Sequence, residues 1–227
     1  MNLIIRSSIL LFLVFLSAGL FASDVRINGA EVGQWTMDYD AAKELAAKKN
    51  LPLMLNFTGS DWCIWCKRMD AQVFAKDAWK KYAEKEVVLV TLDFPRDKSI
   101  VPEELRKRNE ALGQQFGIQG YPTYVVLDSD GATRLGQLGA GTDKTPESFI
   151  QELQELLKLS TPYLEALTKK DPAKAEAIKA AIAELRAARK ELDDWIATRP
   201  QRTPENEKLF EGFLKKIEAA DKALSAF

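Results

Sequence analysis

The sequence contains no histidine among its 227 residues. Ser-His-Asp and Cys-His catalysis therefore have no base, and every metal site with an imidazole ligand is excluded. Cysteine is scarce as well, with two residues in the whole chain. A closed structural zinc site normally takes four Cys or His ligands, so only a zinc ion shared between two chains remains as an alternative. We expect no metal and no cofactor.

An excess of either charge is also missing, because 32 Lys and Arg residues stand against 33 Asp and Glu residues. A nucleic acid partner would need a clustered basic surface, and the composition gives no indication of one. Apolar residues make up 46% and charged residues 29% of the chain, which is typical of a globular protein. The length suffices for one ordinary domain and a smaller appendage.

The first 22 residues have the composition of a secretory signal peptide. Arg6 gives a basic start, residues 9–16 form an unbroken apolar run, and small residues follow up to Ala22. The apolar run is shorter than the roughly 20 residues that a membrane-spanning helix needs. We therefore predict cleavage after Ala22 and a periplasmic or extracellular protein, in a compartment where disulfides persist. An uncleaved N-terminal membrane anchor is the alternative.

Residues 23–160 alternate helical and strand patterns. Helices are predicted over residues 38–50, 77–84, 102–116 and 145–159, and strands over residues 53–57, 87–92, 123–127 and 133–138. The strand patterns are apolar on both faces, as expected for strands in the middle of a sheet. This order predicts an α/β domain in which helices flank a mixed sheet.

Residues 161–227 form a helical extension rich in Ala, Lys, Glu and Leu. Helix starts are predicted at Thr161-Pro162 and Asp171-Pro172. Residues 173–198 and the helix from residue 203 onward each carry one apolar stripe at three- and four-residue steps. The short loop around Pro200 predicts that they form an antiparallel helical hairpin. The stripes indicate packing on the domain or on each other, and the alternative is a docking or self-association element.

The two cysteines lie three positions apart, as Cys63-Ile64-Trp65-Cys66, at the predicted start of a helix. One helical turn brings the two sulfurs together, and the unpaired N–H groups and the helix dipole favour a thiolate at the first. Cys63 is then the exposed nucleophile that forms a mixed disulfide, and Cys66 resolves it. A structural staple is the alternative, but so short a loop removes little chain entropy.

Together with its surroundings, the cysteine pair resembles the active site of the thioredoxin superfamily. Residues 57–67 (Phe-Thr-Gly-Ser-Asp-Trp-Cys-Ile-Trp-Cys-Lys) are similar to its active-site strand and turn, and residues 117–123 (Gly-Ile-Gln-Gly-Tyr-Pro-Thr) to its second signature. The resemblance extends over about residues 34–159. It implies a thioredoxin-like fold, a cis bond before Pro122, and a substrate groove formed by Trp62, Ile64, Trp65, Tyr121 and Pro122.

Two departures from the superfamily bear on the redox direction. Asn56 stands where thioredoxins place a buried aspartate, and an amide cannot take the proton of Cys66. Ile64 and Trp65 match neither the Gly-Pro pair of reducing thioredoxins nor the His-containing pairs of strong oxidants. We therefore expect a thiol-disulfide reductase or isomerase that acts on exported client proteins and exchanges electrons with an unidentified donor or acceptor. The rival hypothesis is a redox-sensing binding module with a helical docking element.

Overall fold

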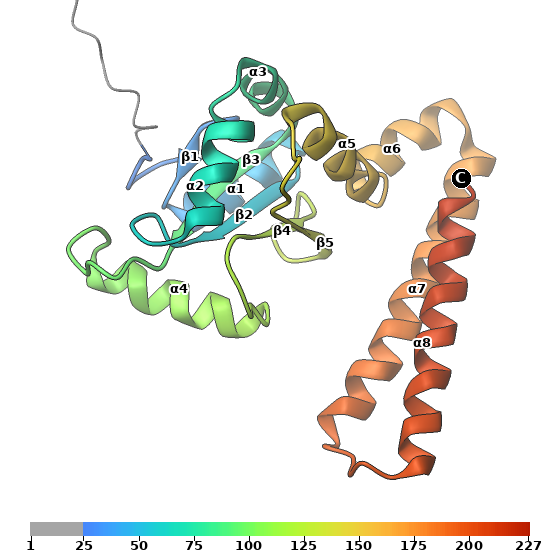
Figure 1. Ribbon diagram of the computed structural model, residues 1–227. Coiled ribbons are helices and arrows are strands. Elements are labelled where there is room, and N and C mark those ends of the chain that lie inside the picture. Colours follow the sequence, from blue (N-terminus) through green and yellow to red (C-terminus); the bar gives the residue numbers. More distant parts are fainter. Residues whose placement is uncertain (1–24) are drawn as a thin grey trace, which may run out of the picture.

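The computed structural model of the protein describes residues 25–227, and the predicted signal peptide, residues 1–22, lies outside the described residues. Figure 1 shows a sheet domain with helices around it, and a long pair of helices that projects away from this domain. Within residues 25–227, no helix has the length and apolarity that crossing a membrane requires.

A five-stranded mixed sheet, in the order β1-β3-β2-β4-β5, forms the centre of the domain. Its strands are β1 (Trp35–Thr36), β2 (Leu53–Thr58), β3 (Val88–Asp93), β4 (Thr123–Leu127) and β5 (Arg134–Gly139). Strand β2 is parallel to β3 and antiparallel to β4, and β4 and β5 pair as an antiparallel hairpin. Every residue of β2 and β3 is buried, as their apolar patterns predict. β1 is absent from the sequence-based prediction because two residues carry no pattern.

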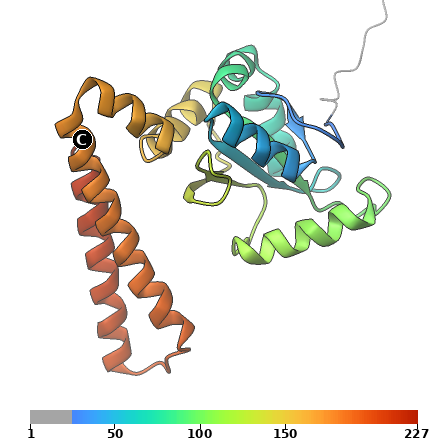
Figure 2. The ribbon, with the colours of Figure 1, turned by 180° about the vertical axis from the view of Figure 1, so that it is seen from behind.

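Helices cover both faces of the sheet, with one apolar cluster under each layer. They are α1 (Tyr39–Lys49), α2 (Ile64–Met69), the π-helical segment η1 (Asp70–Phe74), α3 (Asp77–Glu86), α4 (Glu103–Gln115) and α5 (Pro146–Leu157). One cluster joins α1 and the end of α4 to the sheet, and the other joins α2, η1, α3 and α5 to the opposite face. Seen from behind, α1 lies in front of the sheet (Figure 2).

The extension consists of α6 (Thr161–Lys170), α7 (Pro172–Ala197) and α8 (Pro204–Ser225). Helices α7 and α8 pack side by side, which confirms the predicted helical hairpin (Figure 1). Near its tip, the ring of Trp195 lies 6.1 Å from that of Phe210 and 5.6 Å from that of Phe213, measured between centroids. Asp128, at the end of β4, accepts hydrogen bonds from the backbone N–H and the hydroxyl of Thr161, so the start of α6 is bonded to the domain.

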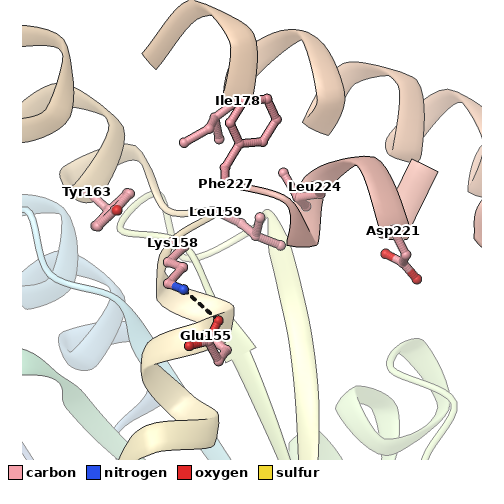
Figure 3. Close-up of a pocket in the computed structure, with 8 residues that line it drawn as sticks. All are labelled: Glu155, Lys158, Leu159, Tyr163, Ile178, Asp221, Leu224 and Phe227. Carbon is pink, nitrogen blue, oxygen red and sulfur yellow. Dashed lines mark hydrogen bonds and ion pairs between the residues drawn. The ribbon is translucent and has the colours of Figure 1, made fainter. Parts of the chain in front are cut away.

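A hollow of about 340 Å³ lies where the extension meets the domain. Figure 3 shows apolar side chains around it and an ion pair between Glu155 and Lys158 at the end of α5. The lining residues are Glu155, Lys158, Leu159, Tyr163, Ile178, Asp221, Leu224 and Phe227. No residue of the Cys63–Cys66 motif lines this hollow. The predicted domain boundary at residue 160 falls beside the hollow and stays a prediction.

Candidate active site

Cys63 and Cys66 form a disulfide at the start of α2, with their Cα atoms 5.2 Å apart. Cys63 is the N-cap residue of the helix, because its backbone is extended (φ −80°, ψ 105°) and its sulfur accepts the N–H of Cys66 at 3.1 Å. An N-cap side chain normally satisfies one of the unpaired N–H groups of the first turn. This N–H group and the helix dipole favour negative charge on the Cys63 sulfur once the disulfide is reduced.

Both sulfurs are largely covered in the disulfide-bonded state, in which Cys63 is 4% exposed and Cys66 is 2% exposed. The sequence predicts an exposed attacking residue, whereas Cys63 is buried in this disulfide-bonded structure. The two residues between the cysteines are the exposed part of the motif, since Ile64 is 77% exposed and Trp65 is 42% exposed. Large apolar side chains in water beside a disulfide are typical of an interaction site.

A second hollow, of about 350 Å³, lies next to this motif. Trp65 forms one wall, and the loop before β4, which carries the cis peptide bond Tyr121–Pro122, forms another; Ala140 and Gly141 complete the lining together with Gly120 and Thr123. The structure thus brings three of the five predicted groove residues, Trp65, Tyr121 and Pro122, to one hollow. Trp62 and Ile64 do not line it.

Four neighbouring residues fix the position of Trp62. Its indole N–H donates to the carbonyl oxygen of Phe94 at 2.8 Å, and its ring meets the ring of Tyr121 edge-on, with centroids 5.6 Å apart. The guanidinium of Arg96 lies over the indole, 5.4 Å from its centroid. Gly59 lies against the indole, because a Cβ atom at this position would come within 2.4 Å of it. Trp62 therefore connects the active-site turn to the Tyr121 loop.

The turn that precedes Cys63 is fixed by a buried carboxylate at the end of β3. Asp93 accepts the backbone N–H of Ser60 at 2.8 Å and the Ser60 hydroxyl at 2.6 Å. Asn109 of α4 donates its side-chain amide to the Asp93 carbonyl at 3.0 Å. Because hydrogen bonds to a charged acceptor are about twice as strong as neutral ones, Asp93 sets the conformation of this turn.

Asn56 lies on the face of the sheet that α2 covers. Residues alternate along β2, and Met54 packs with the α2 side of the sheet, so Asn56 points to the same side. Asn56 is 6% exposed, and within the described part of the chain its side-chain oxygen has no hydrogen-bond partner. A buried polar atom without a hydrogen-bond partner is rare in proteins, so Asn56 is a candidate functional residue.

Asp70 is a carboxylate that the sequence analysis leaves out of the site. It follows Cys66 by four residues, a spacing that places both residues on one face of a helix, and this spacing is the signal by which it could be found. Asp70 is exposed at the surface. Desolvation by the surrounding protein and the negative charge of Asp93 nevertheless raise the pKa of Asp70 to about 6. Burial raises the pKa of Tyr124, and the charge of Asp70 adds to this effect.

Comparisons with known proteins match the sheet domain. A model of the thioredoxin-like domain family matches residues 39–157, and helices α6, α7 and α8 lie beyond that range. The disulfide bond reductase DsbH of Chlamydia pneumoniae is 34% identical over 129 residues, which are 56% of this chain and 74% of that protein. The thioredoxin-related protein DsbJ of the same organism is 27% identical over 139 residues, 59% of this chain and 40% of its own length. A solved structure of a DsbH oxidoreductase covers 58% of this chain and 88% of its own, with 32% identity and a TM-score of 0.51.

Proposed function

Because the chain belongs to the thioredoxin-like domain family, as a protein-disulfide oxidoreductase with a CxxC pair, we propose that it reduces disulfides in exported client proteins. The observation that carries the proposal is the Cys63 sulfur, which caps α2 on the N–H of Cys66 in a motif whose Trp65 lines the hollow of the cis-proline loop. The name of the relative DsbH, a disulfide bond reductase, favours reduction over isomerisation. Isomerisation uses the same first step and is the second candidate activity.

The reaction consists of two exchanges of sulfur partners. In the reduced protein, the Cys63 thiolate attacks a client disulfide, so that a Cys63–client bond forms and one client sulfur leaves as a thiolate. The Cys66 thiolate then attacks the Cys63 sulfur and releases the second client thiol. Two electrons pass to the client, and the protein ends in the Cys63–Cys66 disulfide of this structure. A thiol donor must reduce this disulfide before the next cycle.

The hollow beside the disulfide is the proposed client site. An extended client segment would lie against Trp65, Tyr121 and Pro122, with backbone hydrogen bonds to the loop before β4. Ile64, the most exposed apolar residue of the motif, would contact apolar side chains of the client. Trp62 would position Tyr121 through their edge-on contact.

Trapping tests the assignment of the two cysteines. The Cys66→Ala variant should accumulate mixed disulfides through Cys63, because the resolving step is lost, whereas Cys63→Ala should trap nothing. The wild-type protein should reduce insulin disulfides in the presence of a dithiol donor. A wild-type protein without turnover would instead favour the redox-sensing binding module. Trapping through Cys66 would reverse the two roles.

Export is the remaining part of the proposal, and it rests on residues 1–22. We propose that a signal peptidase removes this segment, so that the mature chain begins at Ser23. The intact mass of protein recovered from the periplasm or medium measures this directly. A mass that includes Met1 and residues 2–22 would support the uncleaved membrane anchor instead.

A further inference from the structure

Arg68 occupies a defined position beside the disulfide. Its guanidinium lies over the ring of Trp65, 4.9 Å from the ring centroid. Trp65 is 42% exposed and forms a wall of the hollow next to the cis-Pro122 loop. A guanidinium attracted to the face of an indole loses part of its freedom, so the positive charge is held against a residue that lines the hollow.

The Arg68 guanidinium makes no ion pair with any carboxylate in residues 25–227. The acidic groups of the active-site turn are occupied by other partners. The Asp61 carboxylate accepts the backbone N–H groups of Arg96 and Asp97 at 2.9–3.1 Å. The Asp93 carboxylate accepts two hydrogen bonds from Ser60. The planar N–H donors of Arg68 therefore face solvent without a carboxylate.

We propose that Arg68, held on Trp65, binds a carboxylate of the client near its reacting sulfur, so that disulfides flanked by Asp or Glu are the preferred substrates. This inference rests on the proposed function of the same site and names its substrate class. A guanidinium presents two parallel donors that match a carboxylate, which an ammonium group cannot do. The overall charge of −1 supplies no general attraction for acidic clients, so the preference has a local origin.

The neighbouring residue provides a matched control. Lys67 carries the same charge one position away on α2, but its ammonium group donates to the Asp61 carbonyl oxygen at 2.7 Å, and it has no aromatic contact in the described part of the chain. Removal of either charge changes the field at Cys63 in the same direction. Only the Arg68 variant removes the cation held on Trp65.

The test uses three disulfide peptides that differ at one residue beside the cysteine, which is Glu, Gln or Lys. The full-length wild-type protein should reduce the Glu peptide with a kcat/KM about fivefold above that for the Gln peptide, the size expected for a partly exposed charge pair. Arg68→Ala should remove this preference and keep turnover of the Gln peptide. Arg68→Lys should retain only part of the preference, and Lys67→Ala should retain all of it. The preference should also shrink as salt increases.

Two kinds of failure can be told apart in the same measurement. Equal rates with the Glu and Gln peptides, or a preference that survives Arg68→Ala, would overturn the role of Arg68 and leave the oxidoreductase function in place. A wild-type protein that turns over none of the three peptides would overturn the proposed function, and the inference with it. Thermal melting of each variant checks that the fold is intact.

Discussion

One atom, the Cys63 sulfur, connects the local structure of the protein to its chemistry. Its position on the N–H of Cys66 follows from the extended backbone of Cys63, which makes this residue the cap of α2. The turn before it is fixed by the hydrogen bonds from Ser60 to Asp93. The turn after β2, the end of β3 and the first turn of α2 therefore hold the reactive sulfur at the N-terminus of α2, where negative charge is favoured.

Gly59 is predicted to be essential for the position of Trp62. In the Gly59→Ala variant the new Cβ would overlap the indole, which its hydrogen bond to Phe94 prevents from moving freely. We expect a loss of about 1–3 kcal/mol in the free energy of unfolding, as for other overpacked sites, and a shifted tryptophan fluorescence spectrum. Urea denaturation and fluorescence measure both. Gly139→Ala is the control, because a Cβ atom there meets nothing within 4 Å; equal effects of the two substitutions would contradict the prediction.

Asp70 is predicted to make stability depend on pH. Its pKa is raised from 3.8 to about 6 in the folded protein, so its contribution to stability is complete below pH 3.8 and is lost as the pH rises through 6. Asp70→Asn should therefore gain stability relative to wild type between pH 4 and pH 7.5. We expect a gain of about 0.5–1 kcal/mol, because water screens this partly exposed group. Urea denaturation at both pH values measures it, and an equal difference at the two would contradict the raised pKa.

At the scale of elements, a buried carboxylate bonds the start of α6 to the domain. Asp128 accepts hydrogen bonds from the N–H and hydroxyl of Thr161, and Asp128→Ala removes both. We expect a loss of about 2–3 kcal/mol and faster amide exchange in residues 161–170, because hydrogen bonds to a charged acceptor are the strong ones. Hydrogen exchange measured by mass spectrometry tests this.

Asp130 provides the control for this element. Its carboxylate accepts three hydrogen bonds, all from Ala132 and Thr133 within the same turn. Asp130→Ala should loosen the β4–β5 turn and leave exchange in α6 unchanged. Faster exchange in α6 with both variants would show that α6 depends on the turn as a whole and not on Asp128.

Local sequence patterns predict most elements of this fold. Thr145, Asp171 and Thr203, each followed by proline, are the N-caps of α5, α7 and α8, as residue types of this kind indicate. The sequence does not predict the π-helical turn η1, because this turn has the same residue types as the helix before it. The spacing of the cysteines predicts the disulfide, but the contacts of Trp62 with Phe94 and Tyr121 join residues that are 32 and 59 positions apart. Such contacts depend on the packed fold and leave no local pattern.

At the scale of the whole molecule, α2, at whose start the disulfide lies, is in a different part of the structure from the helical hairpin of α7 and α8 (Figure 1). The family match ends at residue 157, before the extension begins. The hairpin keeps large apolar side chains exposed, among them Ile196, Leu209 and Leu214. The chemistry therefore belongs to the sheet domain, and self-association through these helices stays a prediction.

Two tryptophans test this independence. Trp195 packs against Phe210 and Phe213 at the tip of the hairpin. Because apolar contacts are lost, Trp195→Ala should lower the free energy of unfolding of the tip by about 1–2 kcal/mol. Insulin reduction should stay within twofold of wild type. Trp79 is buried in the cluster beneath α3, and Trp79→Ala should cost about 3–5 kcal/mol and lower activity as well. Limited proteolysis and insulin turnover measure the two effects. A large loss of activity in Trp195→Ala would place the hairpin in the reaction.

The pH dependence of alkylation at Cys63 is the most direct measurement of the proposed chemistry. Reduced Cys66→Ala protein, which has Cys63 as its one thiol, would be treated with iodoacetamide between pH 4 and pH 10. Because the sulfur caps α2, we predict an apparent pKa clearly below the value of about 8.5 for a free cysteine, and rapid alkylation at pH 7. An apparent pKa at or above 8.5, with slow alkylation at pH 7, would contradict the assignment of Cys63 as the nucleophile.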